Sequence, residues 1–172
     1  MPMFENSYKI RVSARAIVFD EDRLLLNRFG DGAYYNFPGG GIEERENARL
    51  TVVREVNEKT GLEVSAGDFV FALEYEPWNG GHIYGDGHHI SFFFRCELLN
   101  GSRIATPEFP DIDPLNPVMV SQPVWVPIAE LPGIELLPHI NKNLLQYHKT
   151  GIFRPLFLDE PYDNKGKDES DL

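Results

Sequence analysis

The segment at residues 38–62 constrains the fold of this 172-residue chain more than any other. It begins with "PGGG" at residues 38–41, which we expect to break any regular element. A helix is then predicted from about residue 48 to residue 59, with Asn47 as its N-cap and Gly61 as its left-handed C-terminal residue. The apolar residues that share one stripe of this helix are Ala48, Val52, Val53 and Val56. One face of the helix therefore packs on a core.

Two carboxylates lie on the flank of this apolar stripe. Each helical residue turns by about 100°, so Glu55 and Glu58 fall within roughly 60° of each other. Such a pair repels unless a proton or cation lies between the two groups, and Mg²⁺ is commonly held by one or two carboxylates plus substrate phosphate oxygens. Arg54, four residues before Glu58, can brace that carboxylate. The same spacing of charges also occurs on ordinary solvated helix faces.

Other segments predict an α/β fold, in which a mixed sheet has helices on its faces. Two β-rich runs at residues 9–20 and 23–29 form a hairpin pattern. Two long irregular segments, 76–89 and 100–122, have the length of recognition loops. The further expected strands lie at residues 34–37, 69–75, 89–99 and 123–128, and a last helix is expected at 139–149.

Charge and composition restrict the partners and the location of the chain. Sixteen basic residues against 27 acidic ones give a net charge of -11, so the chain has no broad basic surface for a DNA or RNA duplex or an anionic membrane. The single cysteine, Cys96, and the lack of a signal-peptide or membrane-spanning pattern favour the cytoplasm. We expect one domain over residues 1–158 and an acidic, disordered tail over 159–172.

Residues 40–62, "GGIEERENARLTVVREVNEKTGL", resemble the signature of the Nudix hydrolases. Eight of the nine specified positions match, and Lys59 stands where the signature has the second glutamate of a Glu-Glu pair. Flanking segments "NFPGGG" and "VWVPIAEL" are also similar to the family, so that the resemblance extends from about Val12 to Leu145. The matching positions are Gly40, Glu46, Arg54, Glu55, Val56, Glu58, Gly61 and Leu62.

This resemblance implies an α/β/α sandwich and hydrolysis of a phosphoanhydride bond in a nucleoside diphosphate linked to another moiety, with Mg²⁺ or Mn²⁺. Glu55 and Glu58 match metal ligands of the family, and the carbonyl of Gly39 often completes the shell. Arg54 would orient the glutamates. Glu46 would tie the loop to the helix.

Further site residues are implied with open alternatives. Arg28 matches a position that can contact substrate phosphate, although an exposed strand-end arginine is an equally good interpretation. Tyr34 or Tyr35 could stack on a base or sugar, but aromatic residues beside strands are often core residues. The family's general base is a glutamate of this signature or an acid from a later loop. We prefer Glu108 among the loop acids of this chain, which are Glu108, Asp111 and Asp113.

Lys59 admits two interpretations, because a protonated lysine cannot ligate a metal. Its ammonium could replace a cation by pairing with Glu55, leave a site for one Mg²⁺ and contact a substrate phosphate. Alternatively, the side chain could bend to solvent in the last helical turn, which would only weaken the site. We favour reduced metal number with activity retained.

Other functions are open from the sequence. A catalytically weak or silent nucleotide-binding sensor domain is the main alternative to an enzyme, and a phosphate-free interaction domain would require an accidental match to the signature. His82, His88 and His89 lie in one glycine-rich segment, but their spacing matches no standard zinc site. A homodimer is compatible with the sequence, which does not reveal the oligomeric state.

Overall fold

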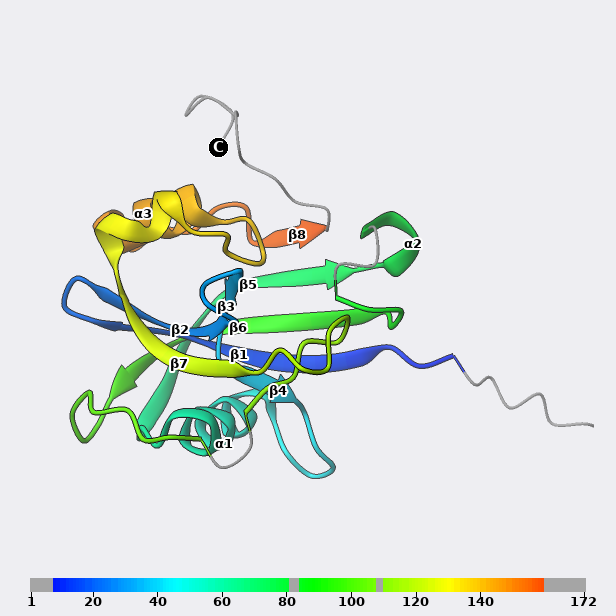
Figure 1. Ribbon diagram of the computed structural model, residues 1–172, viewed down its shortest axis with the longest axis horizontal. Helices are drawn as coiled ribbons and strands as arrows, with labels where there is room; N and C mark the ends of the chain where they lie inside the picture. Colours follow the sequence, from blue (N-terminus) through cyan, green and yellow to red (C-terminus); the bar gives the residue numbers. More distant parts are fainter. Residues whose placement is uncertain (1–7, 81–83, 108–109, 160–172) are drawn as a thin grey trace, which may run out of the picture.

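The computed structural model describes residues 8–80, 84–107 and 110–159. An eight-stranded mixed sheet forms the centre of the molecule. Helix α1 (Ala48–Thr60) lies on one side of the sheet strands, and helix α3 (Asn141–Thr150) lies on the other (Figure 1). The predicted α/β fold is confirmed, and residues 160–172, most of the predicted tail, lie outside the described residues.

The strand order along the main path is β3-β2-β1-β6-β5-β8, while β4 pairs with β1 and β7 pairs with β2. β1 runs parallel to β6, and β5 runs parallel to β8. The other pairs are antiparallel. A short helix α2 (Pro77–Gly80) and a 3₁₀ helix η1 (Ile128–Gly133) lie in the connections. The strands are β1 (Arg11–Asp20), β2 (Arg23–Phe29), β3 (Tyr34–Asn36), β4 (Gly39–Gly41), β5 (Val64–Tyr75), β6 (His89–Leu98), β7 (Ser121–Pro127) and β8 (Phe157–Asp159).

The expectation that residues 38–41 break all regular structure is wrong, because Gly39–Gly41 form β4 and pair with β1. This pairing depends on the missing side chains. A Cβ on Gly39 would lie 2.3 Å from the carbonyl oxygen of Ala14. Only bare backbone can approach β1 this closely.

Helix α1 confirms the prediction from its local pattern. Asn47 caps its start, because the side chain of Asn47 accepts a hydrogen bond of 3.0 Å from the backbone N–H of Leu50. Gly61 ends it with a left-handed φ of 72°. Val52 and Val56 are completely buried, so the predicted apolar stripe packs on the sheet.

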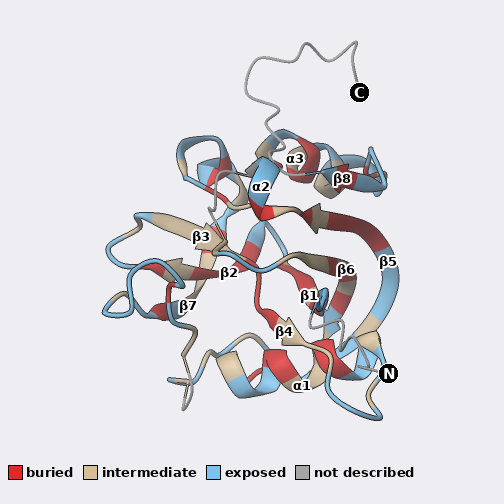
Figure 2. Cartoon of the chain, turned by 90° about the vertical axis from the view of Figure 1, so that its right-hand side faces the viewer, coloured by how far each residue is buried: buried red, intermediate tan, exposed pale blue. Residues whose placement is uncertain are grey.

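Alternating residues of β1 separate two hydrophobic clusters, one on each side of the sheet. Ala14, Ala16 and Val18 pack in the cluster that contains Val52 and Val56 of α1. Ile17 and Phe19 point to the opposite face, into the cluster that includes Leu144 of α3. Figure 2 shows that buried residues concentrate in the strands and on one side of α1. Helix α1 is thereby fixed beside β1 and β4.

No helix within the described residues is long and apolar enough to cross a membrane.

Candidate active site

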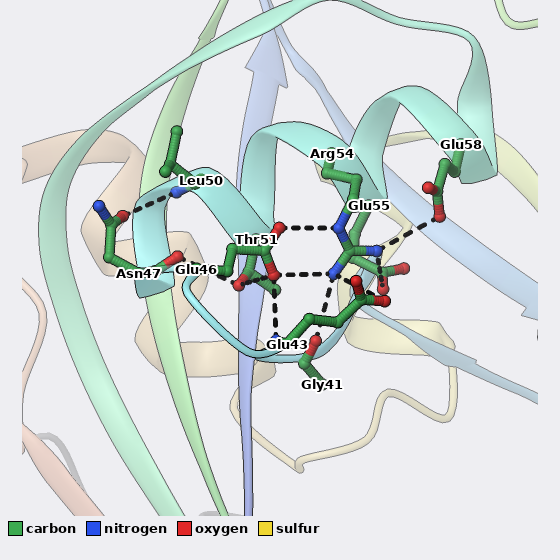
Figure 3. A network of polar contacts seen from close by, with 9 residues as sticks. All are labelled: Gly41, Glu43, Glu46, Asn47, Leu50, Thr51, Arg54, Glu55 and Glu58. Atoms are coloured by element: carbon green, nitrogen blue, oxygen red, sulfur yellow. Dashed lines mark hydrogen bonds and ion pairs between the residues drawn. The ribbon is translucent and has the colours of Figure 1, made fainter.

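The guanidinium of Arg54 is the centre of a polar network between α1 and the loop after β4 (Figure 3). Its Nε and Nη2 donate to the two carboxylate oxygens of Glu46 at 2.8 and 3.0 Å, which is a bidentate pair. Nη2 also donates to the carbonyl of Gly41 at 3.3 Å. Arg54 therefore links the helix to the glycine strand and to the loop.

Glu46, which accepts the two hydrogen bonds from Arg54, is itself fixed by further contacts. It accepts a hydrogen bond of 2.7 Å from the hydroxyl of Thr51 and one of 3.2 Å from the backbone N–H of Glu43. The hydrogen bonds from Arg54 and then from Thr51 lower the pKa of Glu46 to about 2. The same contact with Glu46 raises the pKa of Arg54. The loop that precedes α1 is thus tied to the helix by a pair that is charged at neutral pH.

Glu55 and Glu58 converge on one nitrogen of Arg54. Nη1 of Arg54 lies 2.9 Å from an oxygen of Glu55 and 3.4 Å from an oxygen of Glu58 (Figure 3). Glu55 is 8% exposed and packs against Gly40, where a Cβ would lie 2.2 Å from its Oε1. The glycine at position 40 therefore leaves the space that the Glu55 carboxylate fills.

The carbonyl of Gly39 points away from the strand with which β4 pairs. Hydrogen bonds from Ala16 N–H to Pro38 O and from Ile42 N–H to Val12 O mark the positions where β1 and β4 bond each other. In an antiparallel pair the bonded positions alternate, so the carbonyls of Gly39 and Gly41 point away from β1. Consistent with this direction, the Gly41 carbonyl accepts its bond from Arg54.

These donors fit a divalent cation in chemistry and charge. The carboxylates of Glu46, Glu55 and Glu58 outnumber the single positive charge of Arg54 that they share. Within the described residues no group of three or more His, Cys, Asp and Glu side chains is arranged to hold a metal ion. Mg²⁺ needs fewer, since one or two carboxylates with a backbone carbonyl and substrate phosphate oxygens can hold it.

Lys59 pairs with an acidic residue that the sequence did not indicate as its partner. Its ammonium lies 2.8 Å from Oδ1 of Asp111, and its side chain is 15% exposed. Asp111 also accepts a hydrogen bond of 3.2 Å from Asn27 on β2. The lysine side chain therefore does not bend to solvent, but ties α1 to the segment before β7.

A cavity of about 300 Å³ lies beside these groups. Gly39, Gly40, Gly41, Glu55 and Lys59 line it, so the segment that resembles the Nudix signature borders this cavity. The other residues that line the cavity include Arg11, Arg15, Phe29, Tyr34, Tyr84, His89, Ser91 and Asp111.

The NUDIX domain family model matches residues 9–147, which is most of the chain. The chain belongs to the Nudix family. A MutT-like protein of Streptomyces ambofaciens is 29% identical over 140 residues, which cover 77% of this chain and 82% of that protein.

Solved structures show the same fold. A UDP-X diphosphatase superposes with a TM-score of 0.62 at 17% identity, covering 88% of this chain and 68% of that one. An ADP-ribose pyrophosphatase from Streptococcus suis 89-1591 superposes with a TM-score of 0.56 at 21% identity, covering 88% of this chain and 100% of that one. Both likenesses concern the Nudix architecture.

The substrate-binding residues predicted on β2 and β3 from the Nudix resemblance do not all lie at the cavity. Tyr34 lines the cavity beside Asp113, and burial followed by that hydrogen bond raises the pKa of its hydroxyl. Arg28 and Tyr35 pair across β2 and β3 and are absent from the described cavity walls. Arg28 instead donates a 3.0 Å hydrogen bond to Gln122. Of the predicted loop acids, Glu108 lies outside the described residues.

Several residues of the Nudix cavity were not predicted from the sequence. Arg11 and Arg15 on β1 line it, together with His89 at the start of β6. Burial, and then the positive charges of Arg15 and Arg11, lower the pKa of His89 to about 4. The available signal was the alternation of β1, since residues 11 and 15 share a face with the inward-pointing Ile17.

Proposed function

We propose that this protein is a Nudix pyrophosphohydrolase that uses Mg²⁺ or Mn²⁺ to cleave a phosphoanhydride bond in a nucleoside diphosphate linked to another moiety. The observation that carries this proposal is the convergence of Glu55 and Glu58 on Nη1 of Arg54, beside a small-molecule cavity. Two carboxylates held this close suit a cation between them and a phosphate.

Glu55, Glu58 and the Gly39 carbonyl would hold the metal ion. When bound, the ion would neutralise phosphate oxygens and lower the pKa of a bound water. Arg54 directs both carboxylates by donating to them, and its bidentate pair with Glu46 fixes the guanidinium itself. This preorganised charge is what stabilises a transition state in which charge develops on phosphate oxygens.

A carboxylate from the loop before β7 is a candidate for the general base that takes a proton from water. Glu108 is the candidate preferred from the sequence. The geometry supports Asp111 as the base, because Asp111 lines the cavity and is held by Lys59 and Asn27. Separate Glu108→Gln and Asp111→Asn variants distinguish the two, since only loss of the true base removes the ionisation that limits kcat at low pH.

The cavity volume is at the lower end of the range typical of small-molecule sites. The names of the two structural neighbours, a UDP-X diphosphatase and an ADP-ribose pyrophosphatase, support a substrate whose diphosphate joins a nucleoside to a second group. Tyr34 lines the cavity, which supports a contact of this ring with a base or sugar of the substrate. Lys59, which also lines the cavity, could reach a substrate phosphate.

The test is incubation of the purified protein with Mg²⁺ and a panel of nucleoside triphosphates, nucleotide sugars, ADP-ribose and dinucleoside polyphosphates. We expect hydrolysis of a diphosphate-linked member, and a loss of about 100-fold in kcat for Glu55→Gln. Glu44→Gln is the matched control, because Glu44 is 92% exposed in the preceding loop. Binding of a nucleotide without any product in the whole panel would favour the sensor domain over the enzyme.

We also propose that residues 1–158 form one domain, which the family match over residues 9–147 supports. A cytoplasmic location and a homodimer remain proposals that fractionation and light scattering would test.

A further inference from the structure

On the sheet face opposite α1, strand β1 carries polar residues at its start and buried apolar residues further along. Ile17 and Phe19 of β1 are buried in the hydrophobic cluster, yet Arg11 and Arg15 on the same face line the cavity. In the parallel register, Arg11 lies beside His89 and Arg15 lies beside Phe93. A strand face that changes from apolar to cationic at a cavity wall is typical of a site for an anion.

Neither arginine is held in a direct ion pair within the described part of the chain, although the charges of Asp111 and Glu55 raise the pKa of Arg15 against the larger effect of burial. Among the described residues no carboxylate forms an ion pair with Arg11 or Arg15. Arg15 is partly buried and donates one hydrogen bond, from Nη1 to the carbonyl of Phe37 at 2.8 Å. Burial is the main cause that lowers the pKa of Arg15. A partly desolvated cation without an ion pair gains free energy when an anion binds.

The side chains of Arg11 and Arg15 lie next to the glycines of β4. The Nε and Nη2 atoms of Arg11 are 3.5 Å from the position of a Cβ on Gly41. A Cβ on Gly39 would lie 2.7 Å from Cγ of Arg15. The arginines therefore face the cavity from β1, while Glu55 faces it from α1 on the other side of β4.

We propose that Arg11 and Arg15 form an anion subsite that binds a phosphoryl group of the substrate, next to the metal-binding carboxylates. This inference rests on the proposed function. Guanidinium groups match the geometry of phosphate oxygens, and a diphosphate presents one phosphoryl group to the cation and a second one to the arginines. His89 adds a hydrogen-bonding group on the same wall without adding charge, since it is neutral at pH 7.

Binding of inorganic pyrophosphate in EDTA tests the subsite without metal or turnover. We expect calorimetry to show binding by the unchanged protein, with affinity that falls as salt is added. Arg11→Gln should raise the dissociation constant about tenfold, the usual effect of one charged hydrogen bond. Arg11 is exposed and has no ion pair or side-chain hydrogen bond among the described residues, so the variant should fold normally.

Two further variants complete the test. Arg15→Lys keeps the positive charge but loses the paired N–H donors of the guanidinium group, so it should also weaken pyrophosphate binding. Arg103→Gln is the control for loss of one positive charge, because Arg103 is exposed and lies outside the cavity walls. The subsite is refuted if the unchanged protein does not bind pyrophosphate in EDTA, or if Arg11→Gln and Arg15→Lys bind it as well as Arg103→Gln does.

Turnover measurements identify which anion of the substrate is bound. With Mg²⁺, Arg11→Gln should raise KM equally for UDP-glucose and UDP-glucuronate, because both carry the same diphosphate. An increase for UDP-glucuronate alone would assign the arginines to a carboxylate and overturn the phosphoryl assignment. Pyrophosphate binding that depends on Arg11 in a protein that hydrolyses nothing would leave the subsite standing while the enzyme proposal fails.

Discussion

Replacing Lys59 by glutamate would restore the family signature and should nevertheless damage this protein. Lys59 Nζ lies 2.8 Å from Asp111 Oδ1, and the two side chains are only 15% and 26% exposed. Lys59→Glu would place a carboxylate near that of Asp111, and like charges about 4 Å apart repel by about 1 kcal/mol in water and by about 4 kcal/mol at an effective dielectric constant of ~20. Movement of the segment around Asp111 limits the cost.

We therefore expect Lys59→Glu to lower the free energy of unfolding by about 1 to 3 kcal/mol. For a chain of this size the corresponding decrease in Tm is roughly 3 to 10 °C. Thermal and urea unfolding followed by circular dichroism measure both quantities. Arg103→Glu is the control for an equal change of charge at an exposed position.

A double-mutant cycle isolates the ion pair itself. Lys59→Met and Asp111→Asn, alone and combined, should give a coupling energy of about 1 to 2 kcal/mol. Mg²⁺-dependent turnover is measured on the same variants, and we expect Lys59→Glu to lower kcat/KM because Asp111 lines the cavity. Additive effects in the cycle, or a Lys59→Glu variant that is as stable as the unchanged protein and turns over faster, would show that the lysine only impairs the site.

Two further predictions concern the segment at residues 40–62 that resembles the Nudix signature. Gly40→Ala should reduce turnover by about 100-fold, because its Cβ would lie 2.2 Å from Oε1 of Glu55 and displace that carboxylate; Gly133→Ala, which has nothing within 4 Å, should leave turnover unchanged. Glu46 has a pKa of about 2 in the folded state against an ordinary value of 4.5, so its stabilising effect is complete above pH 4.5 and is lost as the pH falls towards 2. Urea unfolding of Glu46→Gln should accordingly show a stability deficit at pH 6 that shrinks below pH 4, and a deficit that does not depend on pH would contradict the pairing with Arg54.

The sequence predicts helix α1 well because its determinants are local. The apolar stripe, the cap at Asn47 and the left-handed glycine at residue 61 all lie within one segment, and the structure has them as expected. The strand β4 was missed for the opposite reason. Three consecutive glycines carry no β propensity, and their pairing is decided by β1, more than twenty residues away.

The candidate site likewise contains one part that local sequence predicts and one part that depends on contacts between distant segments. Contacts of Arg54 with Glu46, Glu55 and Glu58 all lie within residues 46–58, where the helix and its preceding turn bring the charges together. The cavity walls come from β1, β6 and the segment before β7, so their side chains meet only in the folded sheet. Alternation along β1 does put Arg11 and Arg15 on the same face as Ile17, but this is informative only once the buried face of that strand is known.

Lys59 illustrates why a departure from a signature must be interpreted with its contact partner. A glutamate at position 59 would lie opposite Asp111, and that pair would need a cation between its two carboxylates. The ammonium of Lys59 supplies positive charge at this place within the chain itself, so Asp111 can approach α1 without a bound ion. The lysine is therefore matched to an aspartate 52 residues away, and its effect on metal binding depends on whether Asp111 is kept or exchanged with it.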